Sequence, residues 1–246
     1  MMMAAAICIS AAQGRAEDVF YKTGPFDHLS VRGDVNVVYR CVPDSTGIAR
    51  YDDTGFPDEP FEVTSNKGKV MIKVDPKLPA GTVLPTIYIY SDFLIGVVNE
   101  GSGDMTLHLT AATPTFSARL IGNGRITAHN VNSNDVMASM PTGNGQITLD
   151  GKCRQADFKM VATGTIQADR LEAVEVECKV MGTGTIGCWA EKRLDVRGIG
   201  TTKIYYKGDP AVKKVGGAKL YRLTDESIEV SEEADPEVTV VTADDK

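Results

Sequence analysis

A short turn-like segment returns along the second half of the chain, and no other feature of the sequence limits the fold as strongly. Each copy has a glycine or alanine, a variable residue, a second glycine, a polar residue and an aliphatic marker. The markers are Met105, Ile126, Ile147, Ile166, Ile186 and Ile204, separated by 21, 21, 19, 20 and 18 residues. A period near 20 residues is typical of solenoids, in which each repeat packs against its neighbours.

The residues that follow the turns alternate between apolar and polar side chains. Thr127, Thr148 and Gln167 each lie between two apolar residues of their own repeats. A period of two residues predicts a strand with one buried face, and no helical stripe of apolar residues competes with it. We therefore predict an all-β solenoid whose marker residues form an internal aliphatic ladder.

The second glycine of each turn is a candidate structural residue. These glycines are Gly103, Gly124, Gly145, Gly164 and Gly184. A corner between strands requires positive φ or a close approach of backbones, and both are easier for glycine than for a residue with Cβ. Ala162 occupies the first glycine position of its copy. This substitution indicates that only the second glycine is strictly required.

Polar residues on the outer surface are the candidates for contact with a ligand. Stacked coils repeat about every 4.8 Å, so equivalent residues of successive coils form rows. We name Thr127, Thr148 and Gln167 as candidate contact residues, because such a row offers regularly spaced hydrogen-bond donors and acceptors to a repeating polymer.

The N-terminal third of the chain is rich in strand-like alternation but lacks the glycine turn. The apolar positions are Val35, Val37, Tyr39, Val70, Ile72, Val74, Ile87, Ile89 and Phe93. We interpret residues 24–100 as irregular β coils that cap and begin the solenoid whose regular repeats span 101–210. The alternative is a small separate β-sandwich. The whole folded unit is expected to span residues 17–223.

The two ends of the chain differ in composition from its body. Residues 1–16 are small and apolar before Gln13, which predicts a secretory signal peptide, although no basic residues precede the apolar run. Residues 224–246 contain nine acidic residues and one lysine, a balance of −8 within a total of −7. We expect this tail to be flexible. The remaining charge, about +1 by subtraction, excludes a basic nucleic-acid footprint, and no apolar run is long enough to span a membrane.

At three places the chain resembles the head GIN domain family, whose members are described as auto-transporter adhesins. The opening Phe26-Asp27-His28-Leu29-Ser30-Val31-Arg32-Gly33, the glycine turns and the closing Tyr206-Lys207-Gly208-Asp209-Pro210 carry the resemblance, which covers roughly Phe26 to Tyr221. It implies a single-stranded right-handed parallel β-helix with coils of about 20 residues, an exported location and an adhesin-like role. Family turns are usually Gly-Ser-Gly-Asp, and here only Gly101–Asp104 keeps that form, so a calcium-binding ladder of aspartates is not expected.

Other short motifs have ordinary structural explanations. Arg32-Gly33-Asp34 matches an adhesive tripeptide but lies in a strand-like segment, whereas adhesion requires an exposed loop tip. His108 and His129 occupy related places in successive coils, which favours a surface ladder over a metal site. Four cysteines other than Cys8 are expected to be small buried residues, and one disulfide between two of them is possible without the sequence specifying which two: Cys41, Cys153, Cys178 and Cys188. We predict no catalytic residues, no metal site and no cofactor.

The sequence therefore favours a non-enzymatic scaffold of the cell envelope or surface. The expected location is periplasmic, outer-membrane-associated or extracellular, and the expected partner is a surface glycan or an envelope protein. One alternative is a carbohydrate-active enzyme, a polysaccharide lyase or hydrolase, because parallel β-helices support such enzymes when acids and a base converge. Another alternative is a structural subunit of an envelope assembly. The oligomeric state and the mode of membrane attachment are left open.

Overall fold

The computed structural model describes residues 17–53, 59–79 and 81–223, together with the backbone of three short segments at 2–3, 6–8 and 239–240. The described chain is almost entirely β, with one 3-10 turn, η1 (Pro43–Ser45). The predicted signal peptide 1–16 and the acidic tail 224–246 lie largely outside the described residues. The first strands are β1 (Met2–Met3), β2 (Ala6–Cys8), β3 (Glu17–Lys22), β4 (His28–Arg32), β5 (Val37–Cys41), β6 (Ile48–Asp53), β7 (Phe61–Asn66), β8 (Lys69–Val74) and β9 (Ile87–Ser91).

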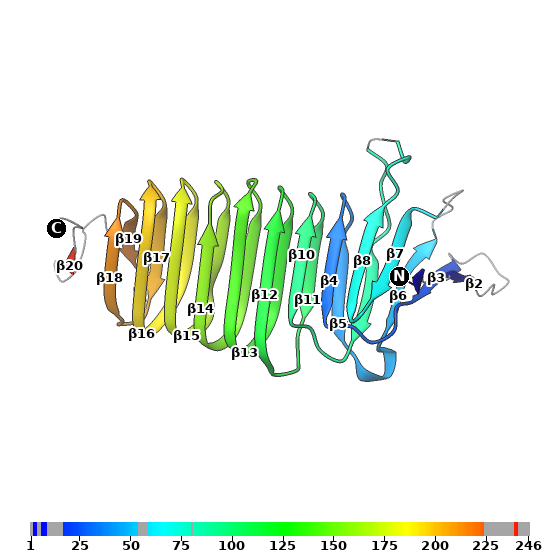
Figure 1. The fold of residues 1–246 in the computed structure, drawn as a ribbon, viewed down its shortest axis with the longest axis horizontal. Coiled ribbons are helices and arrows are strands. Elements are labelled where there is room, and N and C mark those ends of the chain that lie inside the picture. The colour runs from blue at the N-terminus through cyan, green and yellow to red at the C-terminus, as the bar shows by residue number, and fades with distance from the viewer. Residues whose placement is uncertain are drawn as a thin grey trace.

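Parallel coils stack along one axis, as Figure 1 shows. The stack continues through β10 (Gly96–Glu100), β11 (Asp104–His108), β12 (Thr113–Ile121), β13 (Arg125–Thr142), β14 (Gln146–Met160), β15 (Thr165–Gly182), β16 (Thr185–Gly200), β17 (Lys203–Lys207), β18 (Ala211–Gly216), β19 (Lys219–Arg222) and β20 (Thr239–Val240). The expected all-β parallel solenoid with coils about 20 residues apart is confirmed.

Each long strand from β13 to β16 bends at corners and takes part in three successive parallel ladders. Ladder 1 joins the strand ends, for example Ala138 to Phe158 and Phe158 to Cys178. Ladder 2 joins the residues that follow the glycine turns, for example Ile126 to Ile147. Ladder 3 joins the middle segments of the strands, for example Val131 to Gly151 and Ser133 to Cys153. Because every pairing in these ladders is parallel and in register over most of its length, equivalent side chains lie in rows along the axis.

The order of the first coils in space differs from their order in the sequence. Strand β4 pairs with β8 on one side and with β10 on the other. Strand β5 likewise lies between β9 and β11. The coil formed by residues 28–41 is therefore inserted between the coils formed by 69–91 and 96–108. The short connection between β9 and β10 carries the chain from one side of this inserted coil to the other.

Antiparallel strands cover the N-terminal end of the stack. Strand β6 pairs with β9, β7 pairs with β8, and β3 pairs with β6, all antiparallel. This covering satisfies the backbone edge that the first coil would otherwise expose. The segment 24–100 thus belongs to the same continuous set of ladders as the repeats. Of the predicted apolar positions, Phe93 differs from expectation, because it is 44% exposed.

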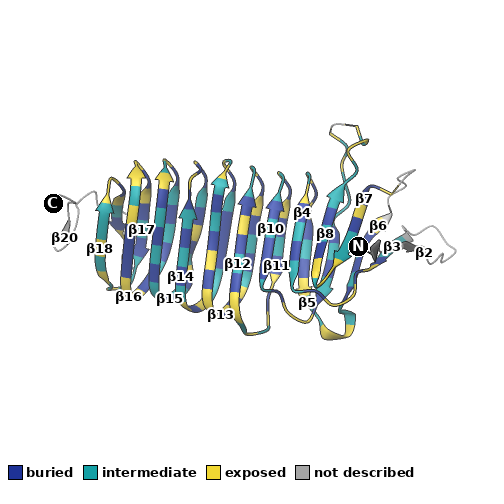
Figure 2. Cartoon of the chain, viewed as in Figure 1, coloured by how far each residue is buried: buried dark blue, intermediate teal, exposed yellow. Residues whose placement is uncertain are grey.

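The core is a continuous column of inward side chains, and the buried bands along the strands are visible in Figure 2. The marker residues Met105, Ile126, Ile147, Ile166, Ile186 and Ile204 are all buried. Aromatic residues fill the N-terminal part, where Tyr51 packs edge-to-face on Phe61. Aliphatic residues, alanines and cysteines fill most of the later coils, with Phe116 and Phe158 as large buried rings, so the core follows from the alternation of apolar residues in the sequence.

The turn glycines bring the backbones of successive coils unusually close. A Cβ on any of the second glycines would lie far inside van der Waals contact of the carbonyl oxygen one coil earlier; for Gly145 this is the oxygen of Gly124. First-position glycines are also required at several coils, since Gly122 has φ +130 and Gly143 has φ +96. The inference from Ala162 that only the second glycine matters is therefore wrong for these coils.

All four described cysteines are free thiols. Cys153, Cys178 and Cys188 are buried, and Cys41 is half-buried. Burial raises the pKa of the Cys153 thiol to about 12. The hydrogen bond with Cys188, followed by burial, raises the pKa of Cys178 well above its ordinary value. Because thiolates are the reactive form, the three buried cysteines act as small apolar residues of the core.

Candidate functional site

The outer surface of ladder 2 carries an in-register row of one residue per coil, which we call the central row. It consists of Thr106, Thr127, Thr148, Gln167, Gly187, Tyr205 and Tyr221. Each member from Thr106 to Tyr205 follows a buried residue of the core ladder, which is why it points outward, whereas Tyr221 follows the half-buried Leu220 and is itself 8% exposed. The central row therefore contains all three contact residues that the sequence predicts, and it brings them into neighbouring coils.

The three predicted contact residues are not equally accessible. Gln167 is exposed and Thr127 is half-buried. Thr148 is 7% exposed, and its hydroxyl accepts a hydrogen bond from Nε2 of Gln146 at 3.0 Å. The same amide nitrogen donates to Oε1 of Gln167 at 3.1 Å. The expectation that Thr148 is a surface contact is thus corrected, because Gln146 covers it, and the accessible polar atoms belong to Gln146 and Gln167.

Two histidines stack at the edge of the same surface. His108 and His129 are in register, with ring centroids 5.4 Å apart. Nδ1 of His129 lies 2.7 Å from Oδ2 of Asp150, and Oδ1 of the same carboxylate accepts a hydrogen bond from the backbone nitrogen of Asn130. Burial, with the neighbouring His129 and Arg40, lowers the pKa of His108. The predicted surface ladder of histidines is present, and within the described residues no group of three or more potential ligands could hold a metal ion.

Aromatic residues continue the central row at its C-terminal end, and sequence reasoning did not identify them. Tyr205 stacks on Tyr221 with ring centroids 5.1 Å apart and 21° between the ring planes. Gly187, in the preceding coil, is in register with Tyr205. Taking the residue after each marker as far as Ile204 would have given Gly187 and Tyr205 from the sequence.

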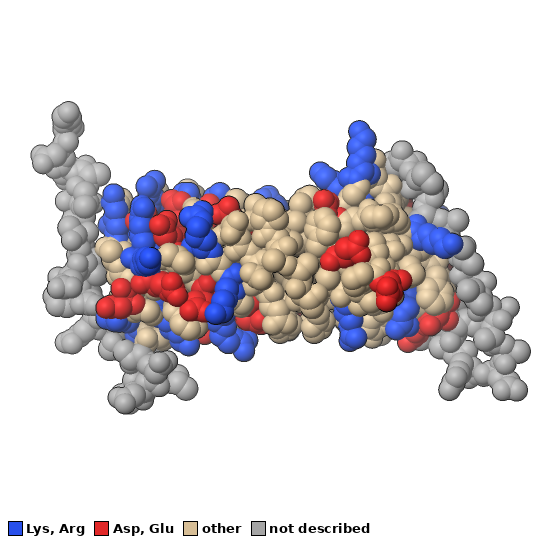
Figure 3. Space-filling view, turned by 90° about the horizontal axis from the view of Figure 1, so that it is seen from below, with Lys and Arg blue, Asp and Glu red and all other residues tan. Residues whose placement is uncertain are grey.

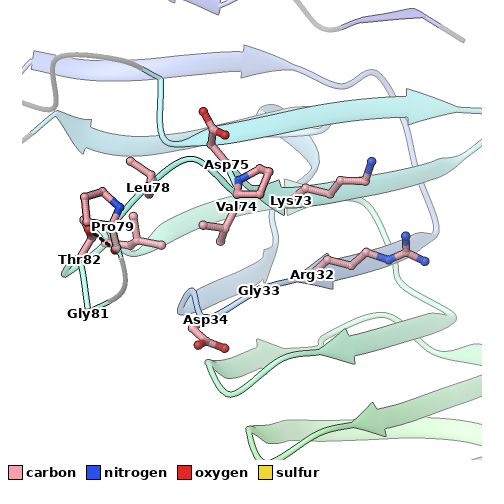
Figure 4. A pocket seen from close by; sticks show the side chains of 12 residues that line it. Arg32, Gly33, Asp34, Lys73, Val74, Asp75, Leu78, Pro79, Gly81 and Thr82 are labelled. Atoms are coloured by element: carbon pink, nitrogen blue, oxygen red, sulfur yellow. Dashed lines mark hydrogen bonds between the residues drawn. The ribbon is translucent and has the colours of Figure 1, made fainter.

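A cavity of about 550 Å³ lies beside the turn between β4 and β5. Figure 4 shows its lining, in which Leu78, Pro79 and Thr82 come from the projecting loop between β8 and β9. Arg32 and Lys73 lie on adjacent strands and point together away from these loop residues. Both cations have partners, Glu100 at 2.7 Å and Glu62 at 3.6 Å.

The tripeptide Arg32-Gly33-Asp34 lines this cavity where β4 ends at Arg32 and the chain turns at Gly33, so only its first residue lies in a strand as the sequence suggested. Oδ1 of Asp34 accepts hydrogen bonds from the backbone nitrogen of Ser102 at 2.9 Å and from its hydroxyl at 2.6 Å. These bonds lower the pKa of Asp34. Since Arg32 is also paired, both charged ends of the tripeptide are engaged within the chain. This arrangement argues against an adhesive role for the motif.

Charged side chains gather on the later coils. On the face drawn in Figure 3 they lie mainly toward the C-terminal end, and the middle of that face has few. On ladder 1, Asp157, Glu177 and Asp195 form an acidic row in register. Each is paired along its own strand: Asp157 with Lys159 at 3.2 Å, Glu177 with Lys179 at 2.9 Å, and Asp195 with Arg193. The cations thus compensate the charges of the acidic row, in which Asp195 is 8% exposed. Among the described residues, no helix is long and apolar enough to cross a membrane.

A family model described as "Putative auto-transporter adhesin, head GIN domain" matches residues 25–210. Among solved structures, a "putative adhesin" from Bacteroides fragilis has a TM-score of 0.74 at 21% identity, covering 84% of this chain and 96% of that chain. A "putative lipid binding protein" from Parabacteroides distasonis has a TM-score of 0.63 at 18% identity, covering 86% and 98%. A "putative adhesin" from Parabacteroides merdae has a TM-score of 0.60 at 16% identity, covering 84% and 95%. At these identities the likeness concerns the fold. No curated protein sequence matches the chain.

Proposed function

We propose that this chain, which belongs to the head GIN domain family, is an exported, non-enzymatic β-helix that binds a glycan of the cell surface or envelope along ladder 2. The family description supports an adhesin-like role. The identity of the ligand, the exported location and the absence of catalysis are parts of the proposal.

The observation that carries the proposal is the in-register polar surface of ladder 2. Beside the central row, residues of successive coils form a second outward row: Asp104, Arg125, Gln146, Thr165 and Thr185. Equivalent groups recur at the spacing of the coils, about 4.8 Å. One sugar unit of an extended polymer is about as long as this spacing or a little longer. Each sugar of a bound polymer can therefore contact the polar residues of one or two coils.

The alternative function, a carbohydrate-active enzyme on this fold, is less consistent with the charged residues of ladder 1 than glycan binding without catalysis. The acidic row on ladder 1 lies beside lysines, which is the residue combination that a lyase or hydrolase would use. However, the hydrogen bond from Lys179 to Glu177 raises the pKa of that lysine. A general base needs a pKa near the working pH, so this lysine is tuned in the wrong direction.

The test is binding of the mature protein, residues 17–246, to an array of bacterial and host glycans, followed by analysis of each bound glycan for shortened products. The double variant Gln146→Ala with Gln167→Ala should bind a positive glycan about thirtyfold more weakly, because two hydrogen bonds worth about 1 kcal/mol each are lost.

The matched control is Gln155→Ala, since Gln155 is half-buried, lies on ladder 1 in register with Asp135 and contacts Arg154. It should retain the affinity of the unmodified protein. Equal weakening by the control and the double variant would contradict a site on ladder 2, and the release of shortened products would contradict a non-enzymatic role.

A further inference from the structure

Tyr205 has one ring face covered and the other directed toward a position without a side chain. Tyr221 stacks on the first face from the following coil. Gly187, in the preceding coil, is in register with Tyr205 and contributes no side chain to the central row. The following row member on that side is Gln167. The half-buried ring of Tyr205 and the exposed amide of Gln167 thus face one another across the coil of Gly187.

The register of the coils leaves room for a flat ring above Gly187. Tyr205 and Gln167 are two coils apart, which corresponds to about 9.6 Å along the axis. A ring between them needs about 7–8 Å, because each contact between carbon atoms is about 3.5–4.0 Å. Asp169 lines one side of the gap: its Oδ1 lies 3.6 Å from where a Cβ on Gly187 would be. A carboxylate at this place accepts hydrogen bonds from hydroxyl groups on the rim of a ring.

The lysines around Tyr205 outnumber the single carboxylate of Asp169 beside the gap, and this balance favours an anionic ligand. Lys203 and Lys207 are two residues before and after Tyr205 in β17, and Lys219 is in register with Lys203. With the residues that the structure describes, none of these lysines forms an ion pair. Each lysine therefore offers an ammonium group close to a ring stacked on Tyr205. A positively charged ligand would be repelled by the same three groups.

We propose that the gap above Gly187 is a binding subsite for a uronate residue of an acidic glycan. In this subsite the sugar ring stacks on the free face of Tyr205, its hydroxyls meet Asp169 and Gln167, and its carboxylate pairs with Lys203 or Lys207. The inference rests on the proposed glycan-binding function and specifies the class of sugar that ladder 2 recognises.

The single tryptophan of the chain reports on this subsite. Trp189 is in register with Lys207 and lies two residues after Gly187 in β16. The probe is tetragalacturonate, with its methyl ester and the neutral cellotetraose as comparisons, titrated into the mature protein. Binding of tetragalacturonate is expected to change the emission of Trp189. The methyl ester and cellotetraose should bind at least tenfold more weakly, since they lack the charge that the lysines recognise.

Three variants separate the parts of the subsite. Gly187→Thr places a β-branched side chain, as Thr127 and Thr148 do in earlier coils, into the gap and should abolish the change in Trp189 emission. Tyr205→Ala should weaken tetragalacturonate binding about tenfold through loss of the aromatic surface. Lys203→Gln should reduce affinity for tetragalacturonate and leave the affinity for the methyl ester unchanged. The control is Tyr88→Ala, because the ring of Tyr88 is covered by Arg50 at 5.0 Å.

The outcomes distinguish this inference from the proposed function. Loss of tetragalacturonate binding in Gly187→Thr and Tyr205→Ala, with retention in Tyr88→Ala, supports the subsite. Glycan binding that depends on Gln146 and Gln167 but not on Gly187 or Tyr205 overturns the subsite and leaves the proposed function in place. Absence of tetragalacturonate binding overturns the assignment to uronates, and absence of binding to every glycan overturns the proposed function. If a variant at Gly187 or Tyr205 fails to fold, the effect of Lys203→Gln on the preference for acid over ester decides the result.

Discussion

Gly145→Ala is expected to lower the free energy of unfolding by about 3 kcal/mol, the upper part of the usual range for an overpacked site. The new Cβ would overlap the carbonyl oxygen of Gly124 and lie 2.6 Å from Cδ2 of Leu120. Relief requires separation of two coils, because the obstructing oxygen belongs to the backbone. The backbone nitrogen of Gln146 donates to that same oxygen at 3.1 Å, so separation also weakens this bond between coils.

The control for this prediction is Gly187→Ala. A Cβ on Gly187 meets nothing closer than 3.6 Å, and its φ is not positive. Replacement by alanine removes the entropic disadvantage of glycine in a strand, so it should be neutral or stabilise the protein by about 0.5–1 kcal/mol. Urea denaturation followed by circular dichroism measures both changes. Equal stability of the two variants would show that the turns do not depend on the close approach of glycines.

Phe158→Ala is expected to cost about 3–5 kcal/mol, the range for removing a buried aromatic side chain. Phe158 is 1% exposed, and its neighbours in ladder 1 are Ala138 and Cys178. These small side chains cannot fill the cavity that the lost ring leaves. Because each coil contacts only its neighbours, a defect in the middle of the stack weakens the coupling between the two halves.

The matched control is Phe93→Ala, since Phe93 is 44% exposed. Its replacement should change stability by about 0.5 kcal/mol or less. The measurement is again urea denaturation, with attention to the slope of the transition as well as its midpoint. A lower slope in Phe158→Ala would indicate that the halves unfold separately. A loss below about 1 kcal/mol would contradict the position of Phe158 in a tightly packed core.

The regular coils could be predicted from the sequence because their information is local. The alternation around Ile126 and Ile147 places both residues inside, and the spacing of the turns places them in register. The order of the first coils could not be predicted in the same way. Nothing near residues 28–41 in the sequence specifies that this coil separates 69–91 from 96–108, since both pairings are between distant segments.

The candidate site was predicted in part, and the differences come from side-chain contacts. Alternation places Thr148 outside, but it cannot show that the longer Gln146 lies over its hydroxyl. Alternation likewise made Arg32-Gly33-Asp34 look like a strand, whereas Gly33 with φ +104 turns the chain there. The aromatic end of the central row required the register to be followed as far as Tyr205. The proposed functional importance of Gly187 becomes apparent only when it is placed next to the ring of Tyr205.

We propose that ladder 2 binds an extended glycan through groups repeated from coil to coil. The most direct test is isothermal titration of the mature protein with oligosaccharides of increasing length, from one sugar to eight, prepared from a glycan that binds on the array. Affinity should rise with each added sugar until the oligosaccharide covers the polar coils, and then stay constant. An affinity that is already maximal for a single sugar, or that shows no dependence on length, would contradict recognition by the repeated surface.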